Sequence, residues 1–418
     1  MKKSPAPSTR TQAALVLQQV LQEKCTLDEA LATRPLQGDA ADTRFIMMLV
    51  LTALRHLGQI DVLLARYVSK PLPEKRVMAR QGLRLGVVQL LLMNTPAHAA
   101  INETVQAVKT SKDMGLSGLV NAVLQKIGRE KPALPPAIHN VPGWLKQRWD
   151  HAYGAETVKV MAAVAATRPP LDLHALAQEF ATGERIDAVI WRLPAEHESV
   201  SELEGYGEGS FWVQDVAATY PVRMLGDVKG LRALDIGAAP GGKTAQLAKA
   251  GAAVTALDKS AARMETLKEN MARLNLTVTV QVADMLHWEP KEQYDVVLLD
   301  APCTATGTWR RHPEVLAVTT QHDITELARQ QRAMLARAWG WVKPGGRLVY
   351  CVCSLEPEEG EQQAAWFVGH YADATMEKPA TVPVSADGTL RTRTDMLHEK
   401  GGMDGFFAVA VRKADDSC

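Results

Sequence analysis

The stretch Leu231-Arg-Ala-Leu-Asp-Ile236, followed at once by Gly237-Ala-Ala-Pro-Gly-Gly-Lys-Thr244, decides the fold of the second half of the chain. Its apolar first part is typical of a buried β-strand, and the small residues after it predict a tight turn into a helix over 242–250. The alternation continues, with strands expected over 254–257, 278–282, 294–299 and 347–352 and helices over 260–274 and 322–342. This rhythm predicts a parallel sheet covered by helices on both faces.

Different patterns precede this alternating region. Residues 9–130 carry apolar side chains at helical spacing, as in Ala13–Leu21 and Phe45–Leu54, and contain few strand signals. The prolines that follow disfavour both helix and strand. We therefore predict four segments, namely a helical domain over 1–130, a proline-rich linker over 131–143, a small α/β subdomain over 144–220 and the alternating domain over 221–418.

Composition and charge narrow the class of protein. A length of 418 residues and a hydrophobic content of 46% suit a folded chain of two or three domains. The net charge is zero, but residues 1–130 hold 17 of the 47 Lys and Arg and only 10 of the 47 Asp and Glu. A basic N-terminal part suits a polyanionic partner such as nucleic acid, although a solvated helical surface gives the same excess.

The cysteines and apolar segments argue against a disulfide-stabilised, metal-binding, secreted or membrane-spanning protein. The five cysteines have no regular spacing and no Cys-x-x-Cys pair, so we expect neither a disulfide framework nor a metal site. Residues 1–10 are polar and lack the apolar core of a signal peptide. The longest apolar runs are too short to span a bilayer. We therefore expect a cytoplasmic protein with free thiols and no membrane partner.

The glycine-rich loop and two later acids predict a site for S-adenosylmethionine. Small residues let the backbone approach a ligand, and a helix N-terminus offers free N–H groups. The next two strands lead to Asp258 and Asp284, which suit ribose hydroxyls and an adenine amino group. The letters of Gly237–Thr244 also fit the phosphate-binding pattern G-x-x-x-x-G-K-[ST], so an ATPase stays open as a rival. The predicted loop residues are Gly237, Ala238, Ala239, Pro240, Gly241, Gly242 and Lys243.

Two thiols and a carboxylate follow two neighbouring predicted strands. Asp300-Ala-Pro-Cys303 comes after the strand over 294–299, and Cys353 comes after the strand over 347–352. Ligands of parallel sheets bind at the carboxyl ends of strands, so we expect these side chains to face one ligand. A thiolate that adds to C6 of a pyrimidine makes C5 able to attack a sulfonium methyl group. Asp300 can hold the N3/N4 edge of the base, and the second thiol can help to release the product.

The segment after Cys353 predicts a helix. Ser354-Leu-Glu-Pro-Glu-Glu359 places proline and acidic residues as they occur in the first turn of a helix. A helix N-terminus at this point would favour the thiolate of Cys353, whereas the nearby glutamates oppose it.

Three motifs resemble those of a known family. They are Asp300-Ala-Pro-Cys-Thr-Ala-Thr-Gly-Thr-Trp-Arg-Arg-His-Pro313, Cys351-Val-Cys-Ser-Leu-Glu-Pro-Glu-Glu-Gly-Glu361 and Gly401-Gly-Met-Asp-Gly-Phe-Phe-Ala408. Together they are similar to the RNA 5-methylcytosine methyltransferases of the NOL/Sun family. The N-terminal part resembles the NusB-like RNA-binding fold through Ile101–Lys109 and Gly118–Ile127. The resemblance covers nearly the whole chain.

This resemblance implies a fold and a cofactor. The fold would be α/β, with a class I Rossmann-like methyltransferase core, an N-terminal all-α NusB-like domain and a small α/β insert. S-adenosylmethionine would be the methyl donor, and the loop 237–243, Asp258, Asp284 and Asp300 would contact it.

The resemblance also implies a role for each thiol and a substrate. Cys353 would be the nucleophile and Cys303 the release thiol. DNA cytosine methyltransferases use the Pro-Cys thiol as the nucleophile instead, and the additional Cys-Ser after the next strand points to the RNA arrangement. The fusion with a NusB-like part resembles family members that act on bacterial 16S ribosomal RNA, and a monomer is expected. The alternatives are a 5-methylcytosine methyltransferase for tRNA or 23S rRNA, and a non-catalytic rRNA-binding assembly factor.

The sequence departs from the family pattern at three places. Val352 replaces the family's usual Thr before the nucleophile and lacks its hydroxyl. Gly237 stands where the family commonly has Cys, which we expect to matter little in a loop lined by backbone. Leu171-Asp-Leu-His-Ala-Leu176 replaces the family's Leu-Arg-Val-Asn run, so the resemblance is weakest over 171–205.

Overall fold

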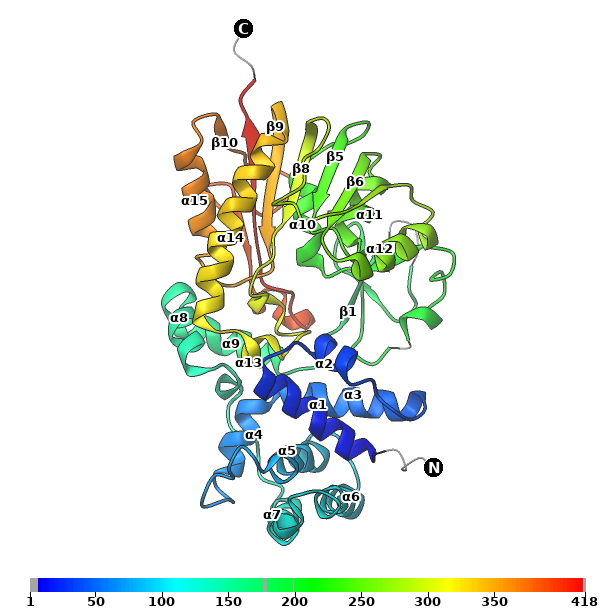
Figure 1. Ribbon diagram of the computed structural model, residues 1–418, viewed down its shortest axis with the longest axis vertical. Helices are drawn as coiled ribbons and strands as arrows, with labels where there is room; N and C mark the ends of the chain where they lie inside the picture. The colour runs from blue at the N-terminus through cyan, green and yellow to red at the C-terminus, as the bar shows by residue number, and fades with distance from the viewer. Residues whose placement is uncertain (1–6, 176–178, 198, 416–418) are drawn as a thin grey trace. The chain divides into compact units, whose positions relative to one another are not determined.

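Helices make up most of the chain between Thr9 and Ala165, as the apolar spacing predicts (Figure 1). The computed structural model describes residues 7–175, 179–197 and 199–415. Leu176 lies outside the described residues, as do residues 1–6 of the predicted segment 1–130 and residues 416–418 of the predicted segment 221–418. The first two helices begin at side-chain caps, since Ser8 accepts from Thr11 N and Thr26 forms a capping box with Glu29. The helices are α1 (Thr9–Glu23), α2 (Leu27–Thr33), α3 (Ala40–Arg55), α4 (Leu57–Leu64), α5 (Val77–Leu91), α6 (Ala97–Lys109), α7 (Ser117–Glu130), α8 (Gly143–Tyr153) and α9 (Ala155–Ala165).

The helices α1 to α7 share one apolar core. It contains Leu17 of α1, Leu49 of α3 and Leu124 of α7, all fully buried. The stretch expected as a linker is packed against α4, because Gln59 Nε2 donates to the carbonyl of Pro135 at 2.5 Å. By internal contacts the first compact unit comprises residues 1–167 and 309–319, which include α13 (Val315–Val318). The domain boundaries predicted from the sequence stay a prediction.

A small antiparallel sheet begins the second compact unit, which comprises residues 168–308 and 320–418. Its strand order is β2-β3-β1-β4, and Leu173 and Phe211 form the centre of its apolar cluster. The ion pair between Arg192 and Asp172 is almost fully buried, and Asp172 also accepts from the backbone N–H of Val216. The strands are β1 (Leu171–Ala175), β2 (Glu184–Arg185), β3 (Ile190–Leu193) and β4 (Phe211–Val213).

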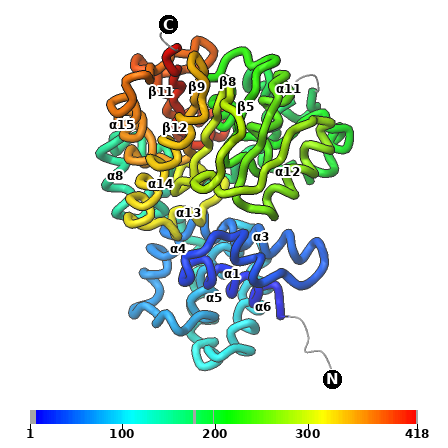
Figure 2. The backbone as a smooth tube through the Cα atoms, turned by 45° about the horizontal axis from the view of Figure 1, so that its top comes forward, coloured from blue at the N-terminus to red at the C-terminus, as the bar shows by residue number. Residues whose placement is uncertain are grey.

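The large sheet has the strand order β10-β12-β9-β8-β5-β6-β7, and β11 pairs with β12 (Figures 1 and 2). Its parallel strands were all predicted; they are β5 (Arg232–Ile236), β6 (Ala253–Asp258), β7 (Thr279–Val282), β8 (Tyr294–Asp300) and β9 (Val342–Val352). Three further strands, which the sequence analysis did not predict, extend the sheet beyond β9 by antiparallel pairing. These strands are β10 (Ala374–Met376), β11 (Thr389–Thr392) and β12 (Phe406–Lys413).

Helices cover both faces of this sheet, as predicted. Val297 and Leu299 of β8 pack with α14 and α15, whereas Val296 and Leu298 of the same strand pack with α10 and α11. Successive side chains of a strand point to opposite faces, so the run Val296–Leu299 is apolar throughout. The helices of this unit are α10 (Val216–Met224), α11 (Gly242–Lys249), α12 (Ala261–Arg273), α14 (Gln321–Gly340) and α15 (Glu361–His370).

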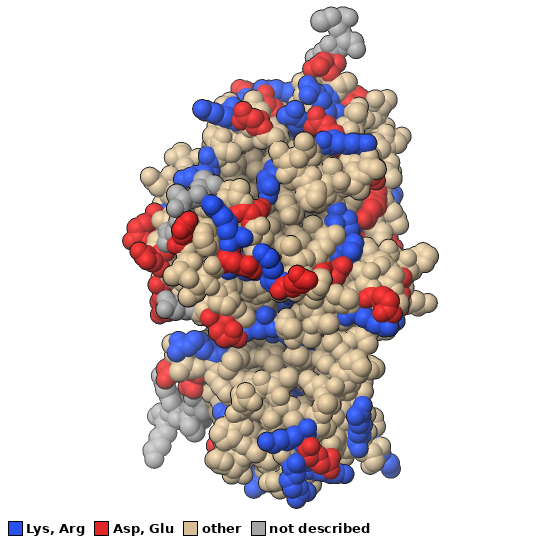
Figure 3. Space-filling model, turned by 180° about the vertical axis from the view of Figure 1, so that it is seen from behind, with Lys and Arg blue, Asp and Glu red and all other residues tan. Residues whose placement is uncertain are grey.

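Figure 3 shows basic and acidic side chains interspersed over the face that it draws. Within the described ranges no single helix is long and apolar enough to cross a membrane, and only the bent pair α3 and α4 passes that test jointly, by length and composition alone.

Candidate active site

The two predicted thiols leave the large sheet side by side. Strands β8 and β9 are parallel neighbours, and Asp300 lies opposite Cys351 in their register. Cys303 and Cys353 follow these two positions closely, so the register brings them to the same edge. Their sulfur atoms are 3.5 Å apart, and both side chains are partly exposed. Residues 50 positions apart therefore form one hydrogen-bonded pair of thiols.

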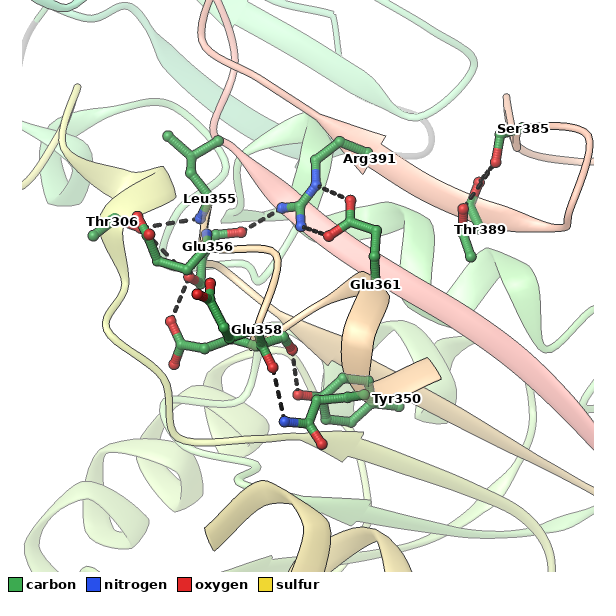
Figure 4. Close-up of polar contacts among 12 residues, drawn as sticks. Thr306, Tyr350, Leu355, Glu356, Glu358, Glu361, Ser385, Thr389 and Arg391 are labelled. Carbon is green, nitrogen blue, oxygen red and sulfur yellow. Dashed lines mark hydrogen bonds and ion pairs between the residues drawn. The ribbon is translucent and has the colours of Figure 1, made fainter. Parts of the chain in front are cut away.

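Backbone contacts hold the two thiol-bearing loops together. The N–H of Gly307 donates to the carbonyl of Cys353 at 3.0 Å, and the carbonyl of Gly307 accepts from the N–H of Gly405 at 2.9 Å. A Cβ atom on Gly307 would lie 1.9 Å from the carbonyl oxygen of Gly405. Thr306 Oγ1 also accepts from the N–H of Leu355 at 3.0 Å (Figure 4). Only glycine fits at this crossing of three loops.

Asp300 lies behind the thiols and is paired with a lysine. Lys243 Nζ donates to Asp300 Oδ2 at 2.7 Å, and their side chains are 12% and 26% exposed. Burial lowers the pKa of Lys243, but Asp300, Cys351 and Asp235 together outweigh it, so the pKa lies above its usual value. Cys351 Sγ is 3.6 Å from Asp300 Oδ1, and burial raises the pKa of this thiol. Cys351 is thus a buried neutral thiol.

The electrostatics distinguish Cys303 from an ordinary cysteine. Its hydrogen bond with Cys353, together with burial, raises the pKa of the Cys303 thiol well above its usual value. Cys303 therefore keeps its proton beside Cys353.

The predicted glycine-rich loop approaches Asp300 closely. Gly237 has a φ of +76°, and a Cβ atom there would lie 2.2 Å from the carbonyl oxygen of Asp300. We expected the exchange of the family's Cys for Gly to matter little here, but in this conformation a side chain would meet the backbone at the end of β8. Thr244, at the start of α11, donates to Asp235 Oδ2 at 2.6 Å and ties the helix to β5.

The two predicted ligand-binding acids lie at the ends of neighbouring strands. Asp258 is nearly buried, accepts from the N–H of Ser260 at 2.9 Å, and lies 3.6 Å from the guanidinium of Arg263. Asp284 is exposed, and its pKa is lowered because it accepts a hydrogen bond from the backbone N–H of Leu286.

One cavity of about 250 Å³ joins the strand ends to the thiols. A larger cavity, of about 650 Å³, lies elsewhere in the same unit and is lined by Glu204, Glu208 and Trp212 among others, none of them predicted site residues. The smaller cavity contains both predicted acids, Asp300 and both thiols. Its lining includes Gly237, Asp258, Asp284, Asp300, Cys303, Gln330, Met334 and Cys353.

These residues fit S-adenosylmethionine. A loop position without room for a side chain adjoins the cavity, and two carboxylates that can accept from hydroxyl or amino groups line it at successive strand ends. The rest of the predicted loop is placed differently. Ala238 and Ala239 are buried against α12, and Lys243 points to Asp300.

Sequence reasoning assigned no function to several residues around the site. Gln330 and Met334 of α14 line the cavity, and Arg263 donates to the carbonyl of Ala239. Glu359 and Arg391 contact the loop that carries Cys353. Gln330 had a weak signal, its place on the helix that follows β8, whereas the contacts of Glu359 and Arg391 depend on the tertiary structure.

The helix predicted directly after Cys353 is absent from that place. Residues 354–360 form a turn, and α15 begins only at Glu361. The N-terminus of α15 therefore does not begin at the thiol. The turn is formed because Ser354 and Glu359 hydrogen-bond to each other instead of continuing a helix.

Comparison with known proteins identifies relatives over nearly the whole chain. A family model described as 16S rRNA methyltransferase RsmB/F matches residues 222–412, and the NusB family model matches residues 7–129. The chain is 32% identical to ribosomal RNA small subunit methyltransferase B of Shewanella oneidensis, over 97% of this chain and 99% of the relative. It is 33% identical to the protein of the same name from Cronobacter sakazakii, over 99% and 100% of the two chains.

Solved structures share the fold. The crystal structure of PH0851 matches with a TM-score of 0.74 at 24% identity, over 99% of this chain and 100% of that one. A methyltransferase homologue from Pyrococcus horikoshii matches with a TM-score of 0.56 at 25% identity, over 67% of this chain and 99% of that one.

Proposed function

The chain belongs to the family of ribosomal RNA small subunit methyltransferases, which use S-adenosylmethionine, and we propose that it methylates C5 of a cytosine in 16S rRNA. The observation that supports this reaction is the pair of thiols 3.5 Å apart, in one cavity with Asp300. Methyl transfer to a nitrogen or a hydroxyl needs no thiol. Methyl transfer to the unreactive C5 of a pyrimidine needs a nucleophile that adds to C6.

We assign the attack to Cys353. Its thiolate forms a bond to C6, and the electron pair of the C5–C6 double bond becomes available at C5. S-adenosylmethionine, when bound, supplies the methyl group that C5 takes. The proton on C5 then passes to a solvent water molecule, and the electron pair of the broken C5–H bond forms the C5–C6 double bond again. The bond between sulfur and C6 breaks at the same time, and Cys353 leaves as a thiolate. Asp300 holds the N3/N4 edge of the ring while charge develops there.

Cys303 assists the release step in this proposal. Its raised pKa keeps it a neutral thiol, so it can donate a hydrogen bond to the sulfur of Cys353 as that sulfur leaves C6. The two thiols therefore have different tasks although they touch each other.

Single alanine substitutions separate the two tasks. Cys353→Ala is expected to abolish both turnover and the covalent RNA adduct. Cys303→Ala is expected to slow release, so that a protein–RNA adduct accumulates as a slow band on a denaturing gel. Cys25→Ala, in the other compact unit, is the matched control and retains wild-type turnover. An adduct that persists in Cys353→Ala but not in Cys303→Ala would reverse the assignment.

The names of the relatives support 16S rRNA as the proposed target, and an experiment in cells tests it. Bisulfite sequencing of RNA with and without the gene is expected to show one cytosine of 16S rRNA that loses its methylation. Loss in tRNA or 23S rRNA instead would assign the enzyme to another substrate. Unchanged methylation in every RNA would favour a non-catalytic rRNA-binding factor. A cytoplasmic monomer, which meets rRNA where it is made, is part of the same proposal.

A further inference from the structure

A buried glutamate joins the two thiol-bearing loops. Glu359 has no exposed surface, and it lies six residues beyond Cys353 in the turn before α15. Its carboxylate accepts from the N–H of Thr304 at 3.0 Å and from the Thr304 hydroxyl at 2.5 Å. It also accepts from the hydroxyl of Ser354 at 2.5 Å. Thr304 directly follows Cys303 and Ser354 directly follows Cys353, so one carboxylate holds the neighbours of both thiols.

A glutamine strengthens this link on the Cys303 side. Gln331 Nε2 donates to Glu359 at 3.0 Å and to the carbonyl of Pro302 at 2.9 Å. Pro302 and Thr304, the two neighbours of Cys303, are therefore both attached to the same carboxylate, one of them through the amide of Gln331. The backbone on either side of this thiol is fixed.

An arginine fixes the Cys353 side from another strand. Arg391 of β11 donates to the carbonyl of Ser354 and forms a two-pronged ion pair with Glu361, at 2.9 and 2.7 Å (Figure 4). Tyr350 donates to the backbone carbonyl of Glu359 at 2.6 Å, which anchors the turn to β9 (Figure 4). The turn is thus held at both of its ends, and Glu359 is the part of it that reaches across to Thr304.

We propose that Glu359 is a positioning residue that sets the distance between the thiols of Cys303 and Cys353. The role rests on the proposed function, in which these thiols react in sequence. A buried carboxylate with four hydrogen-bond donors has well-defined partners, and leaving those donors unpaired is unfavourable. Without Glu359 the Thr304 and Ser354 loops lose their common acceptor, and the thiols can separate. Misplacement of reacting groups by about 1 Å can cost about a hundredfold in rate.

A probe that binds two thiols at once measures this distance without RNA. Phenylarsine oxide reacts with two thiols, forming two arsenic–sulfur bonds and releasing one water. The full-length protein and its Glu359→Ala, Glu359→Asp and Glu359→Gln variants are compared by the rate of arsenical capture, read by intact mass. Cys303→Ser shows that capture needs the pair, and Glu358→Gln removes a carboxylate one position earlier in the same turn. S-adenosylmethionine binding is measured on the same samples by thermal shift.

Glu359→Ala and Glu359→Asp are expected to slow capture about tenfold or more, because an absent or shorter side chain cannot bridge the loops. Glu359→Gln keeps the length and retains most of the rate, since the two hydroxyls can turn to accept from its amide. Cofactor binding is expected to change less than about twofold. Turnover on RNA falls in the same order as capture.

Unchanged capture and turnover in Glu359→Ala overturns the proposal. A parallel loss of capture and cofactor binding in every Glu359 variant also overturns it, because the residue would then support the whole fold. If capture follows the expected order but the wild-type protein methylates no cytosine, the proposed function fails and the positioning role stands.

Discussion

Asp235 lies in β5, just before the glycine-rich loop of the cofactor side of the site. Its carboxyl group is fully buried, and Oδ1 has no hydrogen-bond partner among the described residues. Burial raises its pKa to about 7, although the Thr244 hydroxyl opposes the shift. Because the folded-state pKa lies above the unfolded value, the unfolded chain loses the proton first as pH rises. Asp235 therefore destabilises the native state progressively from about pH 4 to pH 7, and by a constant amount above that.

Asp235→Asn is expected to remove this penalty. The difference in melting temperature between variant and wild type should grow from pH 4 to pH 7 and then level off. Each unit of pKa corresponds to about 1.4 kcal/mol, so the full effect is about 4 kcal/mol as an upper bound. Asp227→Asn changes an exposed acid of the same unit and is the control. A difference that is the same at every pH would contradict this prediction, because it would show that Asp235 ionises at the same pH in the native and unfolded states.

Asp235 and Glu359 also show where residue-level inference from sequence stops. Cys303, Cys353 and Asp300 were found because strand ends of a parallel sheet lie at one edge, a rule that needs only the positions of the strands. Glu359 was seen only as a charge opposing the thiolate. Its function depends on Thr304, 55 positions away, and no local pattern reports such a contact.

At the scale of elements, three loops cross at Gly307. Gly307→Ala is expected to destabilise the protein by about 2–4 kcal/mol and to reduce turnover strongly, because the added methyl group would overlap two carbonyl oxygens. Gly340→Ala, at the end of α14, is the matched control: its Cβ would meet nothing within 4 Å. Alanine in a helix is favoured over glycine by up to about 1 kcal/mol, so this control should be neutral or stabilising. Chemical denaturation of both variants measures the difference, and equal stability would mean that the loops can move apart freely.

The strands that were predicted carry local sequence signals, whereas the pairing of those that were missed depends on distant parts of the chain. The strand β8 is buried on both faces, so Val296–Leu299 form a continuous apolar run. The strands β5 and β6 contain polar residues, but they lead into the glycine-rich loop and Asp258, which mark where they end. The strand β12 begins with an apolar run, and its first three residues belong to the motif Gly401–Ala408. Nothing in its sequence specifies an antiparallel return beside β9. The turn over 354–360 has the letters of a helix start. Hydrogen bonds to a distant loop outweighed that local preference.

At the scale of the whole molecule, the cofactor cavity is lined only by residues of the second compact unit. Ligand binding is therefore expected to be local. Bound S-adenosylmethionine should slow the hydrogen exchange of backbone amides in the loop 237–243 and near Asp258, Asp284 and Asp300. The exchange rates of amides in α1 to α7 should not change. At a ligand concentration a hundred times the dissociation constant, the stabilisation of that unit is about 2.7 kcal/mol.

ATP with magnesium is the discriminating control, since Gly237–Thr244 has the letters of a phosphate-binding loop. A phosphate-binding lysine must point toward the loop and its ligand, but Lys243 is paired with Asp300 at 2.7 Å. The neighbouring hydroxyl, which would bind Mg²⁺ in such a loop, donates to buried Asp235 instead. ATP with magnesium should therefore not slow the hydrogen exchange of backbone amides in either compact unit. Protection of the loop by ATP with magnesium, and none by S-adenosylmethionine, would overturn the assignment of this cavity.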